Sequence, residues 1–477
     1  MPKNNTSIFD TILSHKDSNQ HIVANTYLHI LNAHPKFLEQ YTLDQKTKLW
    51  FSIRSKLALL IKIMKSIIDS KHFYTQKKEN KIDVLFISHL INAKQLLQDN
   101  DSYFGEIPIQ LLESDISSGV VLMNHIGMNG QKIPNNFLNK KIQRFVLSPT
   151  LDFLSEIKLY LSQRRSLRLL KTILNNLHVS KFIKKDISRH HLSSSTFSAL
   201  RVAKQVAGII DKTGAKFIIT TYEGYAWERL VYYYARKANP KIKCFGFQHA
   251  AVFEHQHAIK RSLKVKYNPD VVLTSGSISH ELLTQAKFQD TKLIQLGSPR
   301  HLDSALILER PECCLVLPDA FISECFILFE FSLLYAKKFK NKKFIWRLHP
   351  MLSFEKLKKN SNIFDNLPSN IFLSTQNLEF DIDNCDSVLY RGSTAVIDAI
   401  NSGLTPIYYQ MLSEEKRIDP IFQCKNGKYV VSNENELNYV LLAKGTNQKK
   451  QLLHDFAQDF YTPINIAPLL DEFNNFF

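Results

Sequence analysis

Short apolar segments with the composition of β-strands recur along this 477-residue chain from residue 82 onwards, and helix-like segments separate them. Seven precede the sequence ERPE at 309–312, namely 83–90, 119–126, 143–149, 215–223, 242–249, 269–276 and 292–299. Six follow it, namely 313–320, 343–350, 370–374, 386–393, 404–409 and 428–432. Strands that alternate with helices favour parallel sheets with helices on both faces. Because this is more than one sheet comfortably holds, the pattern predicts an α/β protein with two doubly wound, Rossmann-like domains.

The boundary between the two predicted domains divides the chain into four parts. Residues 1–80 have helical periodicity and no strand pattern, and the last thirty or so residues are helical as well. We therefore expect a helical N-terminal segment over 1–80, a first Rossmann-like domain over 81–308, a second over 309–446 and terminal helices over 447–477. Ligands of open α/β sheets bind beyond the carboxyl ends of the strands, so residues that end predicted strands are the first candidates for a site.

The charge of the chain limits its partners. It has 61 Lys and Arg residues against 44 Asp and Glu residues, a formal net charge of +17 at pH 7. This excess favours nucleic acids, acidic membrane surfaces, nucleotide-activated substrates or anionic glycans. Because the sequence has no zinc-finger, RRM or helix-turn-helix pattern, we do not expect a nucleic-acid partner.

The expected location is the cytoplasm. The six cysteines form no C-x-x-C pair and lie mostly in apolar segments, which indicates buried thiols in a reducing compartment. The N-terminus lacks the apolar region of a secretory signal. No stretch of ~18 uncharged apolar residues is present that could span a bilayer.

Two basic segments could contact the inner face of the cytoplasmic membrane. Residues 46–66 hold six basic residues and no acidic one, with apolar residues at helical spacing at Leu49, Ile53, Leu57, Leu60 and Met64. Residues 151–190 hold nine basic and three acidic residues. Trp50 and Phe51 would be anchors at an anionic membrane surface. An ordinary amphipathic helix with a solvated basic face has the same periodicity, and we favour that interpretation.

Polar residues gather where two predicted strands of the second domain end. One strand ends with Arg347 and His349. A guanidinium suits phosphate oxygens, and a histidine can bind phosphate or protonate a leaving group. Gly392, Ser393 and Thr394 fall where another strand ends and a helix begins. There the two hydroxyl residues either cap the helix or hold an anion at its positive end. The Lys of a P-loop and the G-x-G-x-x-G of a dinucleotide site are both missing.

Carboxylates follow a predicted strand of the first domain. Glu223 ends the strand before a glycine, and Glu228 lies in the first turn of the next helix. Such a carboxylate is a candidate base or nucleophile, although an acidic residue also favours a helix N-terminus. Ser298 and Arg300 follow the last strand of this domain, at the domain junction, where they suit a phosphate group.

A histidine-rich segment follows another strand of the first domain. It begins with Gln248 and His249 and continues with Glu254, His255 and His257. The spacing fits no zinc motif. We expect Gln248 and His249 to line a sugar-binding cleft on the acceptor side instead.

Three features in this order resemble the bacterial glycosyltransferases that use CMP-activated sugars, which are the sialyltransferases and the 3-deoxy-manno-octulosonate (Kdo) transferases of surface polysaccharide synthesis. They are the acid–Gly pair at 223–224, the His-Pro at 349–350 and the Ser-Thr at 393–394. The resemblance covers about 215–410, and residues 1–80 lie outside it. It implies the GT-B fold, in which two Rossmann-like domains face each other.

The resemblance also implies roles for single residues. His349 would contact the phosphate of CMP, and Ser393 and Thr394 would hold its oxygens. Glu223 would be the catalytic carboxylate. Sialyltransferases typically have two acidic residues before the glycine, whereas this chain has one, so Glu228 stays a second catalytic candidate.

These features predict a glycosyltransferase that moves a CMP-activated nonulosonic or Kdo-type acid onto a bacterial surface glycan, which is lipopolysaccharide or a capsule and is free or lipid-linked. Because CMP carries a single phosphate and no D-x-D motif stands out, we expect no metal ion or other cofactor. Three alternatives stay open: a CDP-glycerol or CDP-ribitol phosphotransferase, a sugar-nucleotide epimerase of the same fold, and a non-catalytic glycan-binding scaffold.

Overall fold

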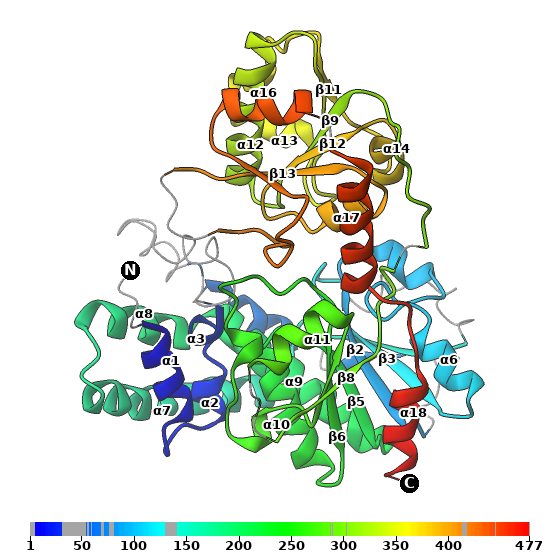
Figure 1. Cartoon of the computed structure of the whole chain (residues 1–477). Helices are drawn as coiled ribbons and strands as arrows, with labels where there is room; N and C mark the ends of the chain where they lie inside the picture. Colours follow the sequence, from blue (N-terminus) through cyan, green and yellow to red (C-terminus); the bar gives the residue numbers. More distant parts are fainter. Residues whose placement is uncertain are drawn as a thin grey trace.

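The protein has two α/β domains, and each is built around one sheet (Figure 1). The computed structural model describes residues 5–30, 54, 57–58, 60–67, 71–75, 81–128, 141–286, 288, 290–301, 303–412, 417–443 and 445–476. The first sheet has the strand order β1-β4-β3-β2-β5-β6-β7-β8, and the second has the order β11-β10-β9-β12-β13-β14. All neighbouring strands are parallel except β1, which pairs antiparallel with β4 at one edge of the first sheet.

All of the described strands except β1 overlap the predicted segments. The first sheet consists of β1 (Phe73–Tyr74), β2 (Val84–Leu90), β3 (Ser118–Asn124), β4 (Gln143–Leu147), β5 (Phe217–Thr221), β6 (Lys243–Gln248), β7 (Val271–Thr274) and β8 (Lys292–Gln295). The second consists of β9 (Cys313–Leu317), β10 (Lys343–Trp346), β11 (Ile371–Leu373), β12 (Ser387–Tyr390), β13 (Thr405–Tyr409) and β14 (Tyr429–Val431). The prediction of two α/β sheets is confirmed. The expectation of no strand within 1–80 is wrong, because β1 has only two residues and so leaves no alternating pattern.

Alternating side chains explain why helices cover both faces of the first sheet. On β2, Leu85 and Ile87 point into one apolar core, whereas Val84 and Phe86 point into another on the opposite face. The helices of this domain are α6 (Ile107–Glu113), α7 (Phe153–Asn176), α8 (Lys181–His191), α9 (Ser194–Thr213), α10 (Ala226–Ala238) and α11 (Ser277–Thr284).

The second sheet is built in the same way. On β9, Leu315 and Leu317 belong to one core, and Cys314 and Val316 belong to the core on the other face. Its helices are α12 (Ile322–Lys338), α13 (Phe354–Lys358), α14 (Leu378–Asp383), α15 (Ala395–Asn401) and α16 (Glu434–Ala443). All six cysteines are free and buried, as the sequence indicates.

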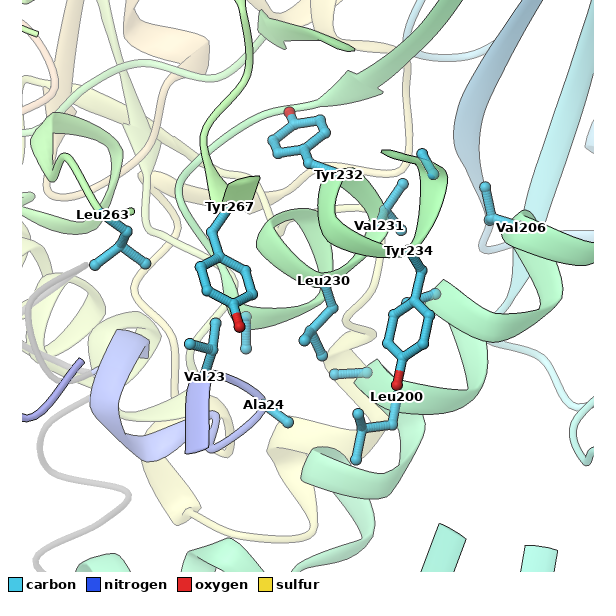
Figure 2. Packing of buried hydrophobic residues seen from close by; sticks show 14 of the residues in the cluster. Val23, Ala24, Leu200, Val206, Leu230, Val231, Tyr232, Tyr234, Leu263 and Tyr267 are labelled. Atoms are coloured by element: carbon cyan, nitrogen blue, oxygen red, sulfur yellow. The ribbon is translucent and has the colours of Figure 1, made fainter. Parts of the chain in front are cut away.

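The N-terminal helices α1 (Asn5–Ser14), α2 (Gln20–Val23) and α3 (Tyr27–Ile30) pack into the first domain. Figure 2 shows Val23 and Ala24 beside Leu200 of α9, Leu230 of α10 and Tyr267. All five belong to the core on one face of the first sheet. The described part of the N-terminal segment therefore shares the hydrophobic core of the first domain.

The C-terminal helices connect the two domains. After the second domain, α17 (Asn447–Phe460) packs along α15, and α18 (Ala467–Asn474) returns to the first domain. There the ring of Phe473 lies 4.2 Å from that of Phe217, centroid to centroid. The segment between the helices passes so close to Gly297 that an added Cβ would lie 2.1 Å from the carbonyl oxygen of Pro463. Both helices lie within residues 447–477, where the sequence analysis expects terminal helices.

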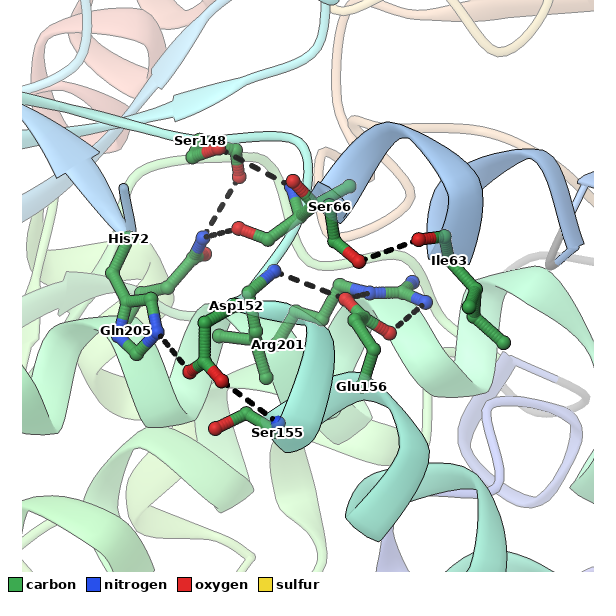
Figure 3. Close-up of polar contacts among 11 residues, drawn as sticks. Ile63, Ser66, His72, Ser148, Asp152, Ser155, Glu156, Arg201 and Gln205 are labelled. Atoms are coloured by element: carbon green, nitrogen blue, oxygen red, sulfur yellow. Dashed lines mark hydrogen bonds and ion pairs between the residues drawn. The ribbon is translucent and has the colours of Figure 1, made fainter. Parts of the chain in front are cut away.

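A buried polar network attaches α7 to α9 (Figure 3). Arg201 donates to both carboxylate oxygens of Glu156, at 2.6 and 2.9 Å. Gln205 donates to the carbonyl oxygens of Ser148 and Thr150, at 2.8 and 3.1 Å, just beyond β4. Helix α9 is thereby fixed both to α7 and to the chain just beyond β4.

The two basic segments differ in how much of them the structure describes. Residues 151–190 form α7 and most of α8. Of 46–66, the structure describes 54, 57–58 and 60–66; Leu49, Trp50, Phe51 and Ile53 lie outside the described residues. Residues 60–67 are helical, and the exposed fractions of Leu57, Leu60 and Met64 are 55%, 54% and 60%. Across the described ranges, no helix is both long enough and apolar enough to cross a membrane.

Candidate active site

The strand order places one switch point in each sheet. Successive strands are added outward in opposite directions from β2 and β5 in the first sheet, and from β9 and β12 in the second. At such points the connections diverge and leave a crevice at the carboxyl ends, where ligands of α/β sheets bind. His89 on β2 and Thr221 on β5 lie at the first switch point. Asp319 after β9 and Gly392 after β12 lie at the second.

Glu223 is the acid at the first switch point. It follows β5, begins the turn into α10, and its side chain is half-buried. Burial raises the pKa of Glu223 to about 7. A carboxyl group with this pKa can take up and release a proton near neutral pH, which is what a general base requires.

Glu228 holds the turn that carries Glu223. It is buried in the first turn of α10. Its carboxylate accepts hydrogen bonds from the amide nitrogens of Glu223 at 3.0 Å, Gly224 at 2.7 Å and Tyr225 at 2.8 Å. This is the reach-back contact of a helix capping box. The geometry therefore gives Glu228 a positioning role, with Glu223 as the carboxyl group free of these backbone contacts.

A histidine pair that the sequence analysis missed lies beside Thr221. The Nε2 atom of His89 is 2.8 Å from the hydroxyl oxygen of Thr221, and its Nδ1 atom is 2.9 Å from Nε2 of His125, which follows β3. The rings of Tyr103 and Trp227 lie 4.9 and 5.6 Å from the ring of His89. Histidines and aromatic rings thus line the carboxyl ends of β2, β3 and β5.

Tyr103 and His249 connect this cluster to Glu223. Their rings are 5.1 Å apart. Burial, followed by the negative charge of Glu223, raises the pKa of Tyr103. Burial lowers the pKa of His249 to about 4 and that of His89 to about 3, so both imidazoles are neutral at pH 7. Neutral imidazole and phenol groups both donate and accept hydrogen bonds, which suits sugar hydroxyl groups.

Gln248 has a different environment from its neighbour His249. It is fully buried, and its Nε2 atom donates to the carbonyl oxygen of Ala250 at 2.5 Å. Its Oε1 atom accepts from the amide nitrogen of Ser275 at 3.1 Å. The side chain therefore joins the ends of β6 and β7, and only His249 of the two faces the cluster.

The turn after β12 requires glycine at position 392. Gly392 has a φ of +66°, and an added Cβ would lie 2.8 Å from a carboxylate oxygen of Asp319. The half-buried Ser393 and Thr394 follow it, directly before α15. The structure thus brings Asp319, Ser393 and Thr394 together at the second switch point.

A buried ion pair holds this turn in place through the residue before Gly392. Arg391 donates from Nε to a carboxylate oxygen of Glu324 in α12 at 2.8 Å, and from Nη1 to the carbonyl oxygen of Tyr409 at 3.1 Å. Both charged side chains have no exposed surface. The pair ties α12, the end of β12 and the end of β13 to one another.

Arg347 and His349 follow β10, one strand from the switch point. Arg347 donates from Nη1 to a carboxylate oxygen of Asp381 and to the carbonyl oxygen of Gln376, both at 2.7 Å. Its guanidinium is therefore engaged by the protein. His349 is exposed, its Nδ1 atom accepts from the amide nitrogen of Met351, and partial burial lowers its pKa.

Arg300 joins the two domains, and Ser298 lies close to it in the chain. Arg300, just beyond β8, donates to the hydroxyl groups of Thr394 at 3.3 Å and Tyr461 at 2.7 Å, and to the carboxylate of Asp398 at 3.0 Å. The hydroxyl oxygen of the buried Ser298 accepts from the amide nitrogen of Arg300. The carboxyl ends of the two sheets therefore approach each other at this junction.

The β12–β14 side of the second sheet has a pocket at each end of its strands. One of about 270 Å³ lies at the carboxyl ends of β13 and β14, and its lining includes Gln410, Met411, Ser432 and Glu436. Another of about 430 Å³ lies at the amino ends of β12 and β13. Because ligands of α/β sheets bind at carboxyl ends, the smaller pocket is the better candidate for a nucleotide.

The histidines after β6 do not meet in a metal centre. His257 pairs with Asp10 of α1 at 2.7 Å, and His255 lies 3.8 Å from Glu254. Within the ranges that the structure describes, no three His, Cys, Asp or Glu side chains gather in a way that could hold a metal ion.

Comparisons with known proteins identify no family from the sequence. No protein-family model and no curated protein match the chain. Solved structures with a similar course of the chain include the UDP-GlcNAc 2-epimerase of Neisseria meningitidis bound to UDP-GlcNAc, with 10% identity over 83% of this chain and 100% of that one and a TM-score of 0.45. The glycosyltransferase SnogD of Streptomyces nogalater has 12% identity over 82% and 100%, with a TM-score of 0.47. The lipopolysaccharide outer core galactosyltransferase WaaB has 13% identity over 83% and 99%, with a TM-score of 0.45.

The fold class follows from the topology of the two sheets and the course of the C-terminal helices. Two doubly wound α/β domains with their carboxyl ends meeting at the junction, and a C-terminal helix that returns to the first domain, form an architecture of the GT-B type. With identities near one in ten and TM-scores below 0.5, the neighbours say nothing about activity. The function has to be argued from the residues of the site.

Proposed function

We propose that this protein is a glycosyltransferase that transfers a CMP-activated nonulosonic or Kdo-type acid to a hydroxyl group of a surface glycan. The observation that carries the proposal is the position of Glu223 at the switch point of the first sheet, with its pKa raised to about 7. In the reaction, the acceptor oxygen attacks the anomeric carbon and gives its proton to Glu223. The bond from that carbon to the phosphate oxygen breaks, and CMP leaves with the electron pair.

The residues of the second switch point support a site for the donor. Ser393 and Thr394 precede α15, where hydroxyl groups and backbone amides can hold a phosphate. We assign His349, which is exposed at the end of β10, to contact the leaving phosphate. Arg347 contributes by fixing this strand end through Asp381. The pocket beyond β13 and β14 is assigned to the nucleoside.

The histidine and aromatic cluster supports a site for the acceptor sugar. His125 is exposed, and Tyr103, Trp227 and His249 are half-buried, so their polar atoms and ring faces are within reach of a ligand. Sugar rings pack on aromatic faces while their hydroxyl groups form hydrogen bonds. The charge of Glu223 acts on Tyr103 of this cluster, which supports an acceptor hydroxyl next to the proposed base.

Replacement of the proposed base tests the reaction. We expect Glu223→Gln to lower kcat for CMP release from CMP-sialic acid or CMP-Kdo by ~100-fold or more, because the amide cannot take up the proton. Glu254→Gln, which changes a half-exposed acid after β6, is the matched control and should keep the wild-type rate. Equal rates for Glu223→Gln and the wild-type protein would contradict the proposal, as would turnover of UDP-sugars or CDP-polyols in preference to CMP-sugars.

A further inference from the structure

The N-terminal helices contact the turn that carries Glu223 through its backbone at Gly224. His29 of α3 is fully buried, with its Nε2 atom 2.8 Å from the carbonyl oxygen of Val23 and its Nδ1 atom 3.3 Å from that of Gly224. Burial lowers the pKa of His29 to about 3, so it is neutral at pH 7. A residue far away in the sequence therefore contacts the neighbour of the proposed base.

Gly224 is also in close contact with the backbone at 258–259. Its φ is +87°, and an added Cβ would lie 2.1 Å from the carbonyl oxygen of Ala258 and 2.6 Å from the amide nitrogen of Ile259. Two backbone segments are thus packed against each other with no side chain between them. Any displacement of 258–259 must move the turn that carries Glu223 as well.

Two buried arginines hold that backbone segment in place. Arg229 donates from Nη2 to the carbonyl oxygens of Ala258 at 3.2 Å and Arg261 at 2.7 Å. Arg261 in turn donates from Nη1 to the carbonyl oxygen of Leu28, in α3, at 3.3 Å. The segment behind Gly224 is therefore anchored to the N-terminal helices through Arg261.

Asp10 of α1 supplies the charge that Arg261 needs. Its carboxylate oxygens lie 2.5 Å from Nε of Arg261 and 2.7 Å from Nε2 of His257. The Arg261 side chain is only 2% exposed, and a buried charge that loses its partner is strongly unfavourable. Lys264 adds a second attachment, since its Nζ atom donates to the carbonyl oxygens of His15, Lys16 and Ser18 at the end of α1.

We propose that the helices α1–α3 are a positioning element of the active site, in which Asp10 acts through Arg261 and the 258–259 backbone to hold the turn that orients Glu223. Asp10 touches no substrate in this account and is a positioning residue. The inference rests on the proposed role of Glu223 as the base.

The test combines kinetics with hydrogen exchange on the full chain. We expect Asp10→Asn to lower kcat for sugar transfer by ~10-fold or more with the donor KM unchanged, because small displacements of a catalytic group are costly. The amides of 223–225, which bind Glu228, should exchange faster than in the wild-type protein, whereas those of β12 should not. Asp10→Glu keeps the charge and should restore both readouts in large part.

Control variants keep the test decisive. Asp17→Asn changes an exposed acid near the same helix, 3.6 Å from His15, and should leave both readouts unchanged. If Asp10→Asn does not fold, Lys264→Met serves instead, because it removes the attachment of α1 and leaves the buried charge pair intact.

The outcomes separate this inference from the proposed function. Wild-type exchange at 223–225 in Asp10→Asn and Lys264→Met would overturn the positioning role. A loss of kcat that Asp10→Glu does not restore would overturn it as well. Failure of the wild-type protein to turn over any CMP-sugar would instead overturn the proposed function, and the exchange data would still report on the positioning of the turn.

Discussion

At the scale of single residues, the burial of Glu223 has two opposing effects. It raises the pKa of the carboxyl group towards the working pH, which the proposed base needs, because ionisation of a buried carboxyl group is unfavourable. For the same reason, it makes the folded protein less stable once this carboxyl group is ionised. The ordinary pKa of a glutamate is 4.5, and that of Glu223 is about 7. Between these values the folded state binds the proton more tightly than the unfolded state. The contribution of Glu223 to stability therefore falls as the pH rises from about 4.5 to about 7.

Glu223→Gln should reveal this cost because the amide does not ionise. We expect the variant and the wild-type protein to be equally affected by pH below about 4.5, and the variant to gain relative stability as the pH rises from about 4.5 to about 7. The gain should be on the order of 1 kcal/mol, since the side chain is only partly buried and water screens its charge. Thermal unfolding of both proteins between pH 4 and pH 8 measures it. A difference in Tm that is independent of pH would show that Glu223 has an ordinary pKa.

The rule that residues at strand ends form the site accounts for part of the site from sequence alone. It selected Glu223, His249, His349 and the Ser-Thr pair before α15. Applied evenly, it would also have selected His89 and His125, which end predicted strands. Tyr103 and Trp227 come from a loop and a helix, so no strand pattern marks them.

The sequence does not show which polar side chains form hydrogen bonds within the protein and are therefore less available to a ligand. Gln248, Arg300 and Arg347 are suited to sugar hydroxyls or phosphate by chemistry, and Glu228 to catalysis. In the structure their hydrogen-bonding atoms contact Ser275, Thr394, Asp381 and backbone amides. These partners are brought together only by folding. The strands, by contrast, follow from local apolar patterns, and among the described strands only the two-residue β1 was not predicted.

At the scale of elements, the Arg391–Glu324 pair joins α12 to the turn that begins α15. Both side chains are fully buried, so their charges depend on each other. We expect Arg391→Met alone to destabilise the protein by ~3–5 kcal/mol, because it leaves the Glu324 carboxylate buried without its partner.

The double variant Arg391→Met/Glu324→Leu tests the cause. Replacing both charges with apolar groups of similar size should recover most of the lost stability. Chemical denaturation of the two single variants and the double variant gives the coupling energy. Additive losses in the double variant would contradict a direct interaction between the two charges.

At the scale of the whole molecule, Arg300 connects the domains through Thr394, Asp398 and Tyr461. The ion pair with Asp398 is partly exposed, so Arg300→Ala should cost less than ~1 kcal/mol of stability. In Arg300→Ala the relative position of the two domains should be less restricted. We therefore expect a higher donor KM and a larger radius of gyration in solution scattering than in the wild-type protein. Arg165→Ala, on the exposed side of α7, is the matched control. Identical scattering and KM for wild type and Arg300→Ala would contradict this role of Arg300.

In the proposed function, the second domain binds a cytidine nucleotide donor for the base in the first. The most direct measurement is the thermal stability of the protein with CMP, CDP, UDP, GDP and ADP in turn. A ligand at 100-fold over its Kd stabilises a protein by about 2.7 kcal/mol, which is readily measured. We expect CMP to stabilise the protein more than the other nucleotides do, and we expect this effect to be lost in the double variant Ser393→Ala/Thr394→Ala. Stabilisation by UDP or GDP in preference to CMP would contradict it.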